Sequence, residues 1–251
     1  MDDTELLKKR FIELANKSYN AGIYLFTDFL GLAEQAVFSE AKASFRGVPY
    51  SFFGGAEGAE RIMVRFGDEE NCGYTQDFPI VCIKAEPVSQ KFADKLTHRD
   101  FLGALLNLGI ERRGLGDIAI LNNVGYIFAK EEMASFIMSE LGRVKHTDVR
   151  ASLAESLPEG ELYKTERRKI QVSSERTDAV IAKVFSLSRD TAQSLFAKRL
   201  VFVDGRLCEN TSYAPRKNEK ISVRGYGRFI YMGYETTSKK GKLNVEVDLY
   251  V

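Results

Sequence analysis

The pattern of apolar and polar positions predicts two helices and then a hairpin at the start of the chain. Residues 4–18 carry one apolar stripe at helical spacing, with Thr4 as a candidate N-cap. A second helical stripe runs over residues 28–45. Residues 51–67 then form two strand-like runs around a Gly-rich turn. We expect a hairpin there rather than a phosphate-binding loop, because no Gly-Lys-Ser/Thr sequence follows the glycines.

The middle of the chain alternates between strand and helix patterns. The expected elements are strands at 79–88, 116–122, 125–129 and 146–153 and helices at 98–110 and 131–142. The resulting order β-α-β-β-α-β is the ferredoxin-like arrangement, which the RNA-recognition fold also uses. Tyr126 and Phe128 alternate on one of these strands, as base-stacking aromatics do, although such a pair is more often part of a core.

The last part of the chain reads as two short helices followed by a small sheet. Ser174 is the expected cap of a helix that runs to about Phe185. Ser188 is the expected cap of a second helix that runs to about Arg199.

Three strand signals follow these helices. Asp204-Gly205 is a strong hairpin signal, and residues 220–225 supply a further strand. A terminal hairpin follows, with Lys239, Lys240 and Gly241 at or near its turn.

We expect an α+β protein of three small domains. Pro158 and Gly160 mark the boundary before the last of them. The expected domains are a mixed α/β domain over residues 1–76, a ferredoxin-like domain over residues 77–158, and a helix-and-sheet module over residues 159–251.

The charge is distributed unevenly over these parts. Residues 1–160 hold 18 Lys and Arg against 24 Asp and Glu, whereas residues 161–251 hold 18 against 11. The first part therefore carries −6 and the second +7, which sums to the net charge of +1. A basic half of this kind indicates a polyanionic partner, with an ordinary solvated basic face as the alternative.

The few cysteine and histidine residues do not indicate a further function. Three cysteines and two histidines show no metal-binding spacing, so we expect no metal and no cofactor. The acidic start of the chain is unlike a signal peptide, and no apolar run is long enough to span a membrane. We therefore expect a cytoplasmic protein.

Basic side chains from several elements of the last module are the candidate RNA contacts. Arg189 and Gln193 lie four residues apart and are expected to share a solvent-facing side of the second helix. Folded RNA is recognised largely through phosphates, shape and ribose hydroxyls, which suits an array of guanidinium groups. The candidate residues are Arg176, Lys183, Arg189, Gln193, Lys198, Arg199, Arg206, Arg216, Lys217, Arg224 and Arg228.

The last module resembles the αL-type RNA-binding domain named for ribosomal protein S-four. The resemblance is carried by the runs Arg176-Thr177-Asp178, Ser188-Arg189 with Ala192, Val203-Asp204-Gly205 and Asn218-Glu219-Lys220-Ile221-Ser222-Val223. Thr177 replaces the usual Leu of that pattern, Asp204 the usual Asn, and Arg199 a common Gly.

A longer resemblance covers most of the chain. The runs YLFTDFLGLAEQ, LTHRDFLGALLNLGIERRGLGDI and SVRGYGRF are similar, in this order, to the YlmH-like bacterial proteins. The resemblance implies that the central domain, residues 77–158, binds RNA. It implies binding of the protein to rRNA of the large ribosomal subunit, with tRNA as a second candidate partner. It also implies a part in the rescue of stalled subunits that carry peptidyl-tRNA, and a weaker link to cell division.

Two other function classes compete with a non-catalytic RNA-binding factor. The first is an RNA-modifying enzyme or its accessory, and the second is a cell-division scaffold that binds protein through the acidic half. Asp204-Gly205-Arg206-Leu207 inverts the Gly-Arg-Leu-Asp order that a pseudouridine synthase requires. His98 with Asp100 is a candidate acid/base pair, but Thr97 and Asp100 also fit a helix start, which is the favoured interpretation. The pair Glu131 and Glu132 opens a helix, where the dipole favours acidic residues. We therefore expect no catalytic residues.

Overall fold

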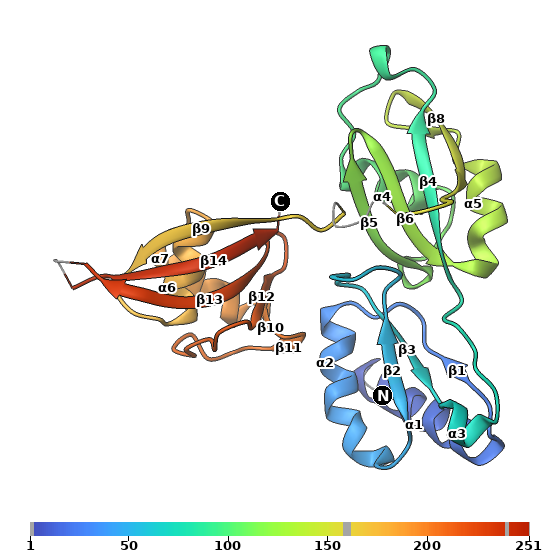
Figure 1. Ribbon diagram of the computed structural model, residues 1–251, viewed down its shortest axis with the longest axis horizontal. Helices are drawn as coiled ribbons and strands as arrows, with labels where there is room; N and C mark the ends of the chain where they lie inside the picture. The colour runs from blue at the N-terminus through green and yellow to red at the C-terminus, as the bar shows by residue number, and fades with distance from the viewer. Residues whose placement is uncertain (1–2, 158–161, 239–240, 251) are drawn as a thin grey trace. The chain divides into compact units, whose positions relative to one another are not determined.

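The chain forms a mixed α+β structure in two compact units, residues Met1–Tyr163 and Lys164–Val251 (Figure 1). The computed structural model describes residues 3–157, 162–238 and 241–250. The expected boundary residues Pro158 and Gly160 and the expected turn residues Lys239 and Lys240 lie outside the described residues.

The N-terminal part of the first unit packs helices against a small sheet. Its helices are α1 (Asp3–Ala21), α2 (Leu32–Ala41), the 3-10 turn Lys42–Phe45 and the short α3 (Glu69–Cys72). Its strands are β1 (Leu25–Phe26), β2 (Tyr50–Phe53) and β3 (Met63–Phe66), in the order β1-β3-β2. The β2–β3 pairing confirms the predicted hairpin around the Gly-rich turn.

Two helix starts differ from the expectations in this part. The first helix begins at Asp3, so Thr4 lies in its first turn and is not the cap. The second helix begins at Leu32 rather than near Asp28, because Leu30 is extended and forms a β-bridge with Ile62. Local periodicity could not show this pairing, since the two residues are far apart in the sequence.

The second part of this unit has the predicted strands and helices in the predicted order, and one strand that was not predicted, β7, between the last helix and the last strand. Its strands are β4 (Ile80–Pro87), β5 (Leu115–Leu121), β6 (Val124–Lys130), β7 (Arg143–Val144) and β8 (Thr147–Leu153), in the sheet order β5-β6-β4-β8-β7. Its helices are α4 (His98–Asn107) and α5 (Ala134–Glu140), with 3-10 turns at Gln90–Phe92, Arg112–Gly114 and Glu131–Met133. Asn122 and Asn123 form the tight β5–β6 turn with φ values of 51° and 64°.

Both parts of the first unit have their own buried clusters. One gathers Phe11, Phe38 and Phe66, and the other gathers Phe101 and Leu105 with the inner face of the five-stranded sheet. The division of this unit into domains 1–76 and 77–158, and its ferredoxin-like classification, stay predictions.

The Gly-rich hairpin contacts the larger sheet of the first unit. The backbone N–H groups of Glu60 and Arg61 donate to the Asp117 carboxylate at 2.7 and 3.0 Å, and the Arg61 guanidinium donates to the Leu115 carbonyl at 2.9 Å. A Cβ at Gly55 would lie 2.2 Å from the Phe128 ring, so only glycine allows this close approach.

Phe128 is therefore covered by protein. Its exposed fraction is 1%, which leaves no ring face for a nucleobase. For Phe128 the expectation of a core residue is confirmed, and the alternative of base stacking is wrong. Tyr126 is half-buried.

The second unit packs two helices against a six-stranded sheet. The helices are α6 (Thr177–Val184) and α7 (Arg189–Ala197). The strands are β9 (Thr165–Val172), β10 (Val201–Val203), β11 (Arg206–Leu207), β12 (Lys220–Val223), β13 (Gly227–Thr237) and β14 (Leu243–Tyr250), in the order β11-β10-β12-β13-β14-β9. The predicted hairpins at Asp204-Gly205 and at the end of the chain are confirmed as β10–β11 and β13–β14.

A single apolar cluster joins the helices and the sheet of the second unit. Val180, Phe196, Phe229 and Val247 are buried within it. Strand β9 pairs with β14 along its whole length, from Thr165 opposite Tyr250 to Val172 opposite Leu243. The N-terminal strand of this unit is therefore held by the last strand of the chain.

Candidate nucleic-acid interface

Three of the predicted RNA contacts meet at one buried carboxylate, that of Asp178. The Arg176 guanidinium donates to both Asp178 oxygens at 3.1 and 2.9 Å. Gln193 Nε2 donates to Asp178 Oδ2 at 2.8 Å, and Arg189 Nη2 lies 3.5 Å from Oδ1. The Asp178 side chain has no exposed surface, whereas those of Arg176 and Arg189 are 36% and 44% exposed. We call Arg176, Asp178, Arg189 and Gln193 the carboxylate cluster.

The environment of Asp178 keeps its carboxylate charged. Burial raises the pKa of Asp178, but hydrogen bonds from Gln193 and Arg176 and the charge of Arg189 together hold that pKa below its usual value. At neutral pH two guanidinium groups are therefore oriented by one negative charge while part of each faces solvent. Such pre-oriented forks suit phosphate oxygens.

The start of α6 is fixed by contacts that replace the expected cap. Arg176, not Ser174, is the N-cap residue. The backbone N–H and the hydroxyl of Thr177 both donate to the Tyr213 carbonyl, at 2.8 and 2.7 Å. The buried hydroxyl of Thr177 thus has a hydrogen-bond acceptor. The αL-type domain that this module resembles usually has Leu at this position.

The start of α7 follows the prediction, but the Gln193 side chain of this helix does not face solvent as expected. The Ser188 hydroxyl accepts a hydrogen bond from the Thr191 N–H at 3.1 Å, which confirms the expected cap. Arg189 is the first residue of the helix and is exposed, as expected. Gln193 does not point freely to solvent, because its amide is bound to the Asp178 carboxylate.

A second group of cations lies at the end of α7. The helix ends at Ala197, and Arg199 adopts a left-handed conformation with φ of 57°. Its N–H donates to the Phe196 carbonyl, and the Leu200 N–H donates to the Leu195 carbonyl, which is the hydrogen-bond pattern of a Schellman motif. The Arg224 N–H donates to the Leu200 carbonyl at 2.9 Å, so the exposed Arg224 lies beside this helix end.

The remaining predicted contacts are distributed over the unit. Exposed side chains are those of Lys183, Lys198, Arg206, Arg216 and Lys217. Arg228 differs from the expectation: only 9% of it is exposed, and its guanidinium lies 4.2 Å from the centre of the Tyr250 ring. Arg228 on β13 lies over the Tyr250 ring on β14 and is buried there, so Arg228 is not part of an accessible basic surface.

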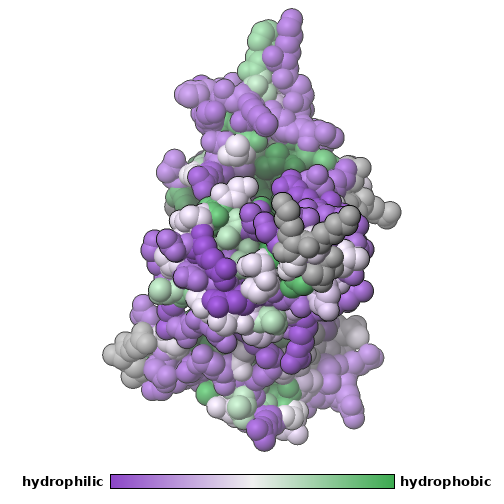
Figure 2. Space-filling view, turned by 90° about the vertical axis from the view of Figure 1, so that its left-hand side faces the viewer, coloured by the Kyte–Doolittle hydropathy of each residue, from purple (hydrophilic) through white to green (hydrophobic). Residues whose placement is uncertain are grey.

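The face drawn in Figure 2 is mostly hydrophilic, with hydrophobic groups gathered only in small areas. Charged and polar contacts are therefore the main chemistry that this face offers.

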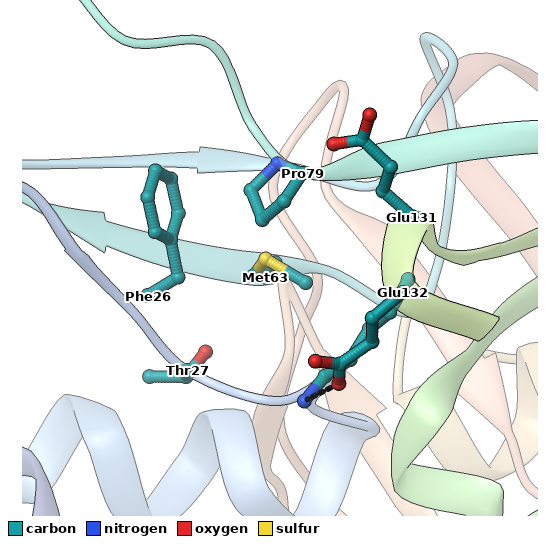
Figure 3. Close-up of a pocket in the computed structure, with 7 residues that line it drawn as sticks. Phe26, Thr27, Met63, Pro79, Glu131 and Glu132 are labelled. Carbon is teal, nitrogen blue, oxygen red and sulfur yellow. Dashed lines mark ion pairs between the residues drawn. The ribbon is translucent and has the colours of Figure 1, made fainter.

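The first unit contains a pocket of about 410 Å³ with an acidic rim (Figure 3). Phe26, Met63 and Pro79 form its apolar wall, and Glu131 and Glu132 come from the 3-10 turn. The Lys130 ammonium forms ion pairs with Asp28 and, at 3.5 Å, with Glu132, as the dashed line in the figure marks. These carboxylates would repel a phosphate, so the pocket does not suit RNA.

The other acidic candidate of this unit has a structural partner. Asp100 accepts hydrogen bonds from the N–H and the hydroxyl of Thr97 at 2.8 and 2.7 Å. These bonds form the capping box of α4 and lower the pKa of Asp100. The expected helix start is confirmed.

Thiol and metal chemistry have few candidates here. Cys72, Cys82 and Cys208 are free thiols, and burial raises the pKa of Cys82 to about 12. Among residues 3–157, 162–238 and 241–250, no cluster of His, Cys, Asp or Glu could hold a metal ion. No helix in the same described ranges is long and apolar enough to cross a membrane.

Comparison with known proteins places the chain in a family. A family model described as "Putative RNA-binding domain in YlmH" matches residues 74–156. A Bacillus subtilis (strain 168) protein, "Ribosome-associated protein quality control protein P2", is 30% identical over 226 residues, which are 87% of this chain and 84% of the relative. The chain belongs to the YlmH family.

One solved structure also aligns with this YlmH-family chain. It is named "Cell division protein ylmH from Streptococcus pneumoniae" and has 21% sequence identity and a TM-score of 0.48. The alignment covers 61% of this chain and 92% of that one.

Sequence reasoning missed two features of this interface. Asp178 was recognised as part of a motif but not as the residue that gathers Arg176, Arg189 and Gln193. The sequence signal for this role was the run Arg176-Thr177-Asp178 at the start of a predicted helix, which places an acidic residue two positions after an arginine. The exposed ring of Tyr226, within the run SVRGYGRF, was also missed.

Proposed function

We propose that this protein is a non-catalytic RNA-binding factor that binds rRNA of the large ribosomal subunit. In this proposal it acts in the rescue or quality control of stalled subunits that carry peptidyl-tRNA, and tRNA is a second partner. The carboxylate cluster carries the RNA-binding part: it presents two oriented guanidinium groups from the starts of two helices. The name of the B. subtilis relative supports the ribosomal part.

The exposed cations of the second unit support the same proposal. The unit that contains them has an excess of basic residues, and several cations accompany the carboxylate cluster on its surface. Contacts to phosphates release counterions, so binding weakens as salt rises. The αL-type classification of this unit is part of the proposal.

The test is co-sedimentation of the purified full chain with large ribosomal subunits at several salt concentrations. Arg189→Ala should weaken binding by about 1–3 kcal/mol, which is about 5- to 150-fold. Arg168→Ala is the matched control: its side chain is also 44% exposed and also paired with a carboxylate, that of Glu166, in the same unit. Equal binding by both variants and the unchanged protein would refute the proposed surface.

The other functions make different predictions. A division scaffold would keep its binding partner after ribonuclease treatment. An RNA-modifying enzyme would leave a changed nucleotide in the bound RNA, which mass spectrometry of that RNA would detect. Either result would overturn the proposal.

A further inference from the structure

We propose that Tyr226 is a stacking platform for an unpaired RNA base, with Arg224 beside it to contact a neighbouring phosphate. This proposal rests on the proposed RNA-binding function and adds the kind of RNA that the second unit prefers.

The turn between β12 and β13 holds Tyr226 in a defined position. The turn consists of Arg224, Gly225 and Tyr226, and the Tyr226 N–H donates to the Val223 carbonyl at 3.0 Å. Gly225 and Gly227 have φ values of 88° and 133°, which other residues rarely adopt. The backbone on both sides of the ring therefore requires glycine, and the ring position is built into the turn.

The Tyr226 ring packs against one aromatic neighbour, and the residue is nearly half exposed. Its centre lies 6.1 Å from that of Phe185, and Phe185 lies 5.9 Å from the fully buried Phe229. Tyr226 itself is 45% exposed. An aromatic residue that is packed against the core through one neighbour and exposes much of its surface is a suitable platform for a base.

Exposed cations lie on the segments that the fold brings next to this turn. Arg224 comes two residues earlier and is exposed. Its backbone bond to Leu200 brings the turn to the end of α7, where Lys198 and Arg199 are exposed. Arg199 has one carboxylate partner, Glu209 at 3.8 Å. A nucleobase is flanked by phosphates, so an exposed ring among cations fits RNA better than an apolar protein surface.

The test uses the full chain and two RNA probes of otherwise identical sequence. One is a hairpin with a single bulged 2-aminopurine, and the other is the same hairpin with that base paired. Tyr226→Ala should weaken binding to the bulged probe about 5- to 100-fold and abolish quenching of the 2-aminopurine fluorescence. Tyr226→Phe, which keeps the ring, should bind within about twofold of the unchanged protein.

The outcomes separate this proposal from the function on which it rests. Selective loss of the bulged probe by Tyr226→Ala, with an unchanged circular dichroism spectrum, supports stacking. Equal affinity of Tyr226→Ala and the unchanged protein for both probes overturns stacking, as does an equal loss on both. If Arg189→Ala still weakens both probes in those cases, RNA binding stands. If the unchanged protein binds neither probe, the stacking proposal fails, while the proposed function is decided separately by co-sedimentation with large ribosomal subunits.

Discussion

Replacing Asp178 by Asn tests whether one buried charge organises the candidate interface. The substitution keeps the shape of the side chain but removes the charge that faces Arg176 and Arg189 and that accepts from Gln193. It also places amide hydrogens opposite the guanidinium groups of Arg176 and Arg189, which can only donate. We therefore expect the second unit to lose stability and both guanidinium groups to lose their orientation.

The expected loss of stability follows from the burial of the Asp178 carboxylate and from the exposure of its two arginine partners. Removing one partner of a buried ion pair costs about 3–5 kcal/mol when the remaining charge stays buried. Here the remaining guanidinium groups are 36% and 44% exposed, so water replaces part of the lost interaction. We expect a loss of about 2–3 kcal/mol in the free energy of unfolding of the second unit.

The measurement is urea unfolding followed by circular dichroism, with hydrogen exchange of the α6 amides to assign the transition to the second unit. Asp190→Asn is the control, because Asp190 is exposed in the first turn of α7 and should contribute only about 0.3–1 kcal/mol through the helix dipole. A loss below about 0.5 kcal/mol for Asp178→Asn would refute the reasoning.

The pH dependence gives an independent check of the same charge. The folded-state pKa of Asp178 is lowered, so its contribution is fully present above the unfolded value of about 3.9 and is lost as pH falls through the folded pKa. The stability difference between the unchanged protein and Asp178→Asn should therefore shrink below about pH 4. If this stability difference were equal at neutral and at strongly acidic pH, the charge of the Asp178 carboxylate would not be the source of the difference.

Three further substitutions test local features. Ser188→Ala removes the cap of α7 and should cost about 1 kcal/mol in urea unfolding, and no change would show that the hydroxyl bond to Thr191 contributes nothing. Arg199→Gly should stabilise the second unit by about 0.5–1 kcal/mol, because Arg199 has a φ of 57°, and a lower midpoint of unfolding would contradict this strain argument. Asp117→Ala leaves the N–H groups of Glu60 and Arg61 without their acceptor and should destabilise the first unit by about 1–3 kcal/mol. Unchanged hydrogen exchange of those two amides would contradict that contact.

The sequence by itself determined the features that depend on neighbouring residues. The Ser188 cap, the capping box of Thr97 and Asp100, and the hairpin at Asp204-Gly205 were all readable, because each is made by residues within a few positions of one another. The alternation of strands and helices in the middle of the chain was readable for the same reason.

Only the tertiary structure decided which charged and aromatic residues are accessible. Arg228 and Arg224 look alike in the sequence, yet Arg228 is buried over Tyr250 and Arg224 is exposed. The sequence left Phe128 open as a stacking candidate, but in the structure the hairpin at Gly55 covers its ring. Burial depends on segments that are distant in the sequence, and no local pattern records which of them will meet. The same long-range packing joined Asp178 at the start of α6 to Arg189 and Gln193 on α7, and so created the carboxylate cluster.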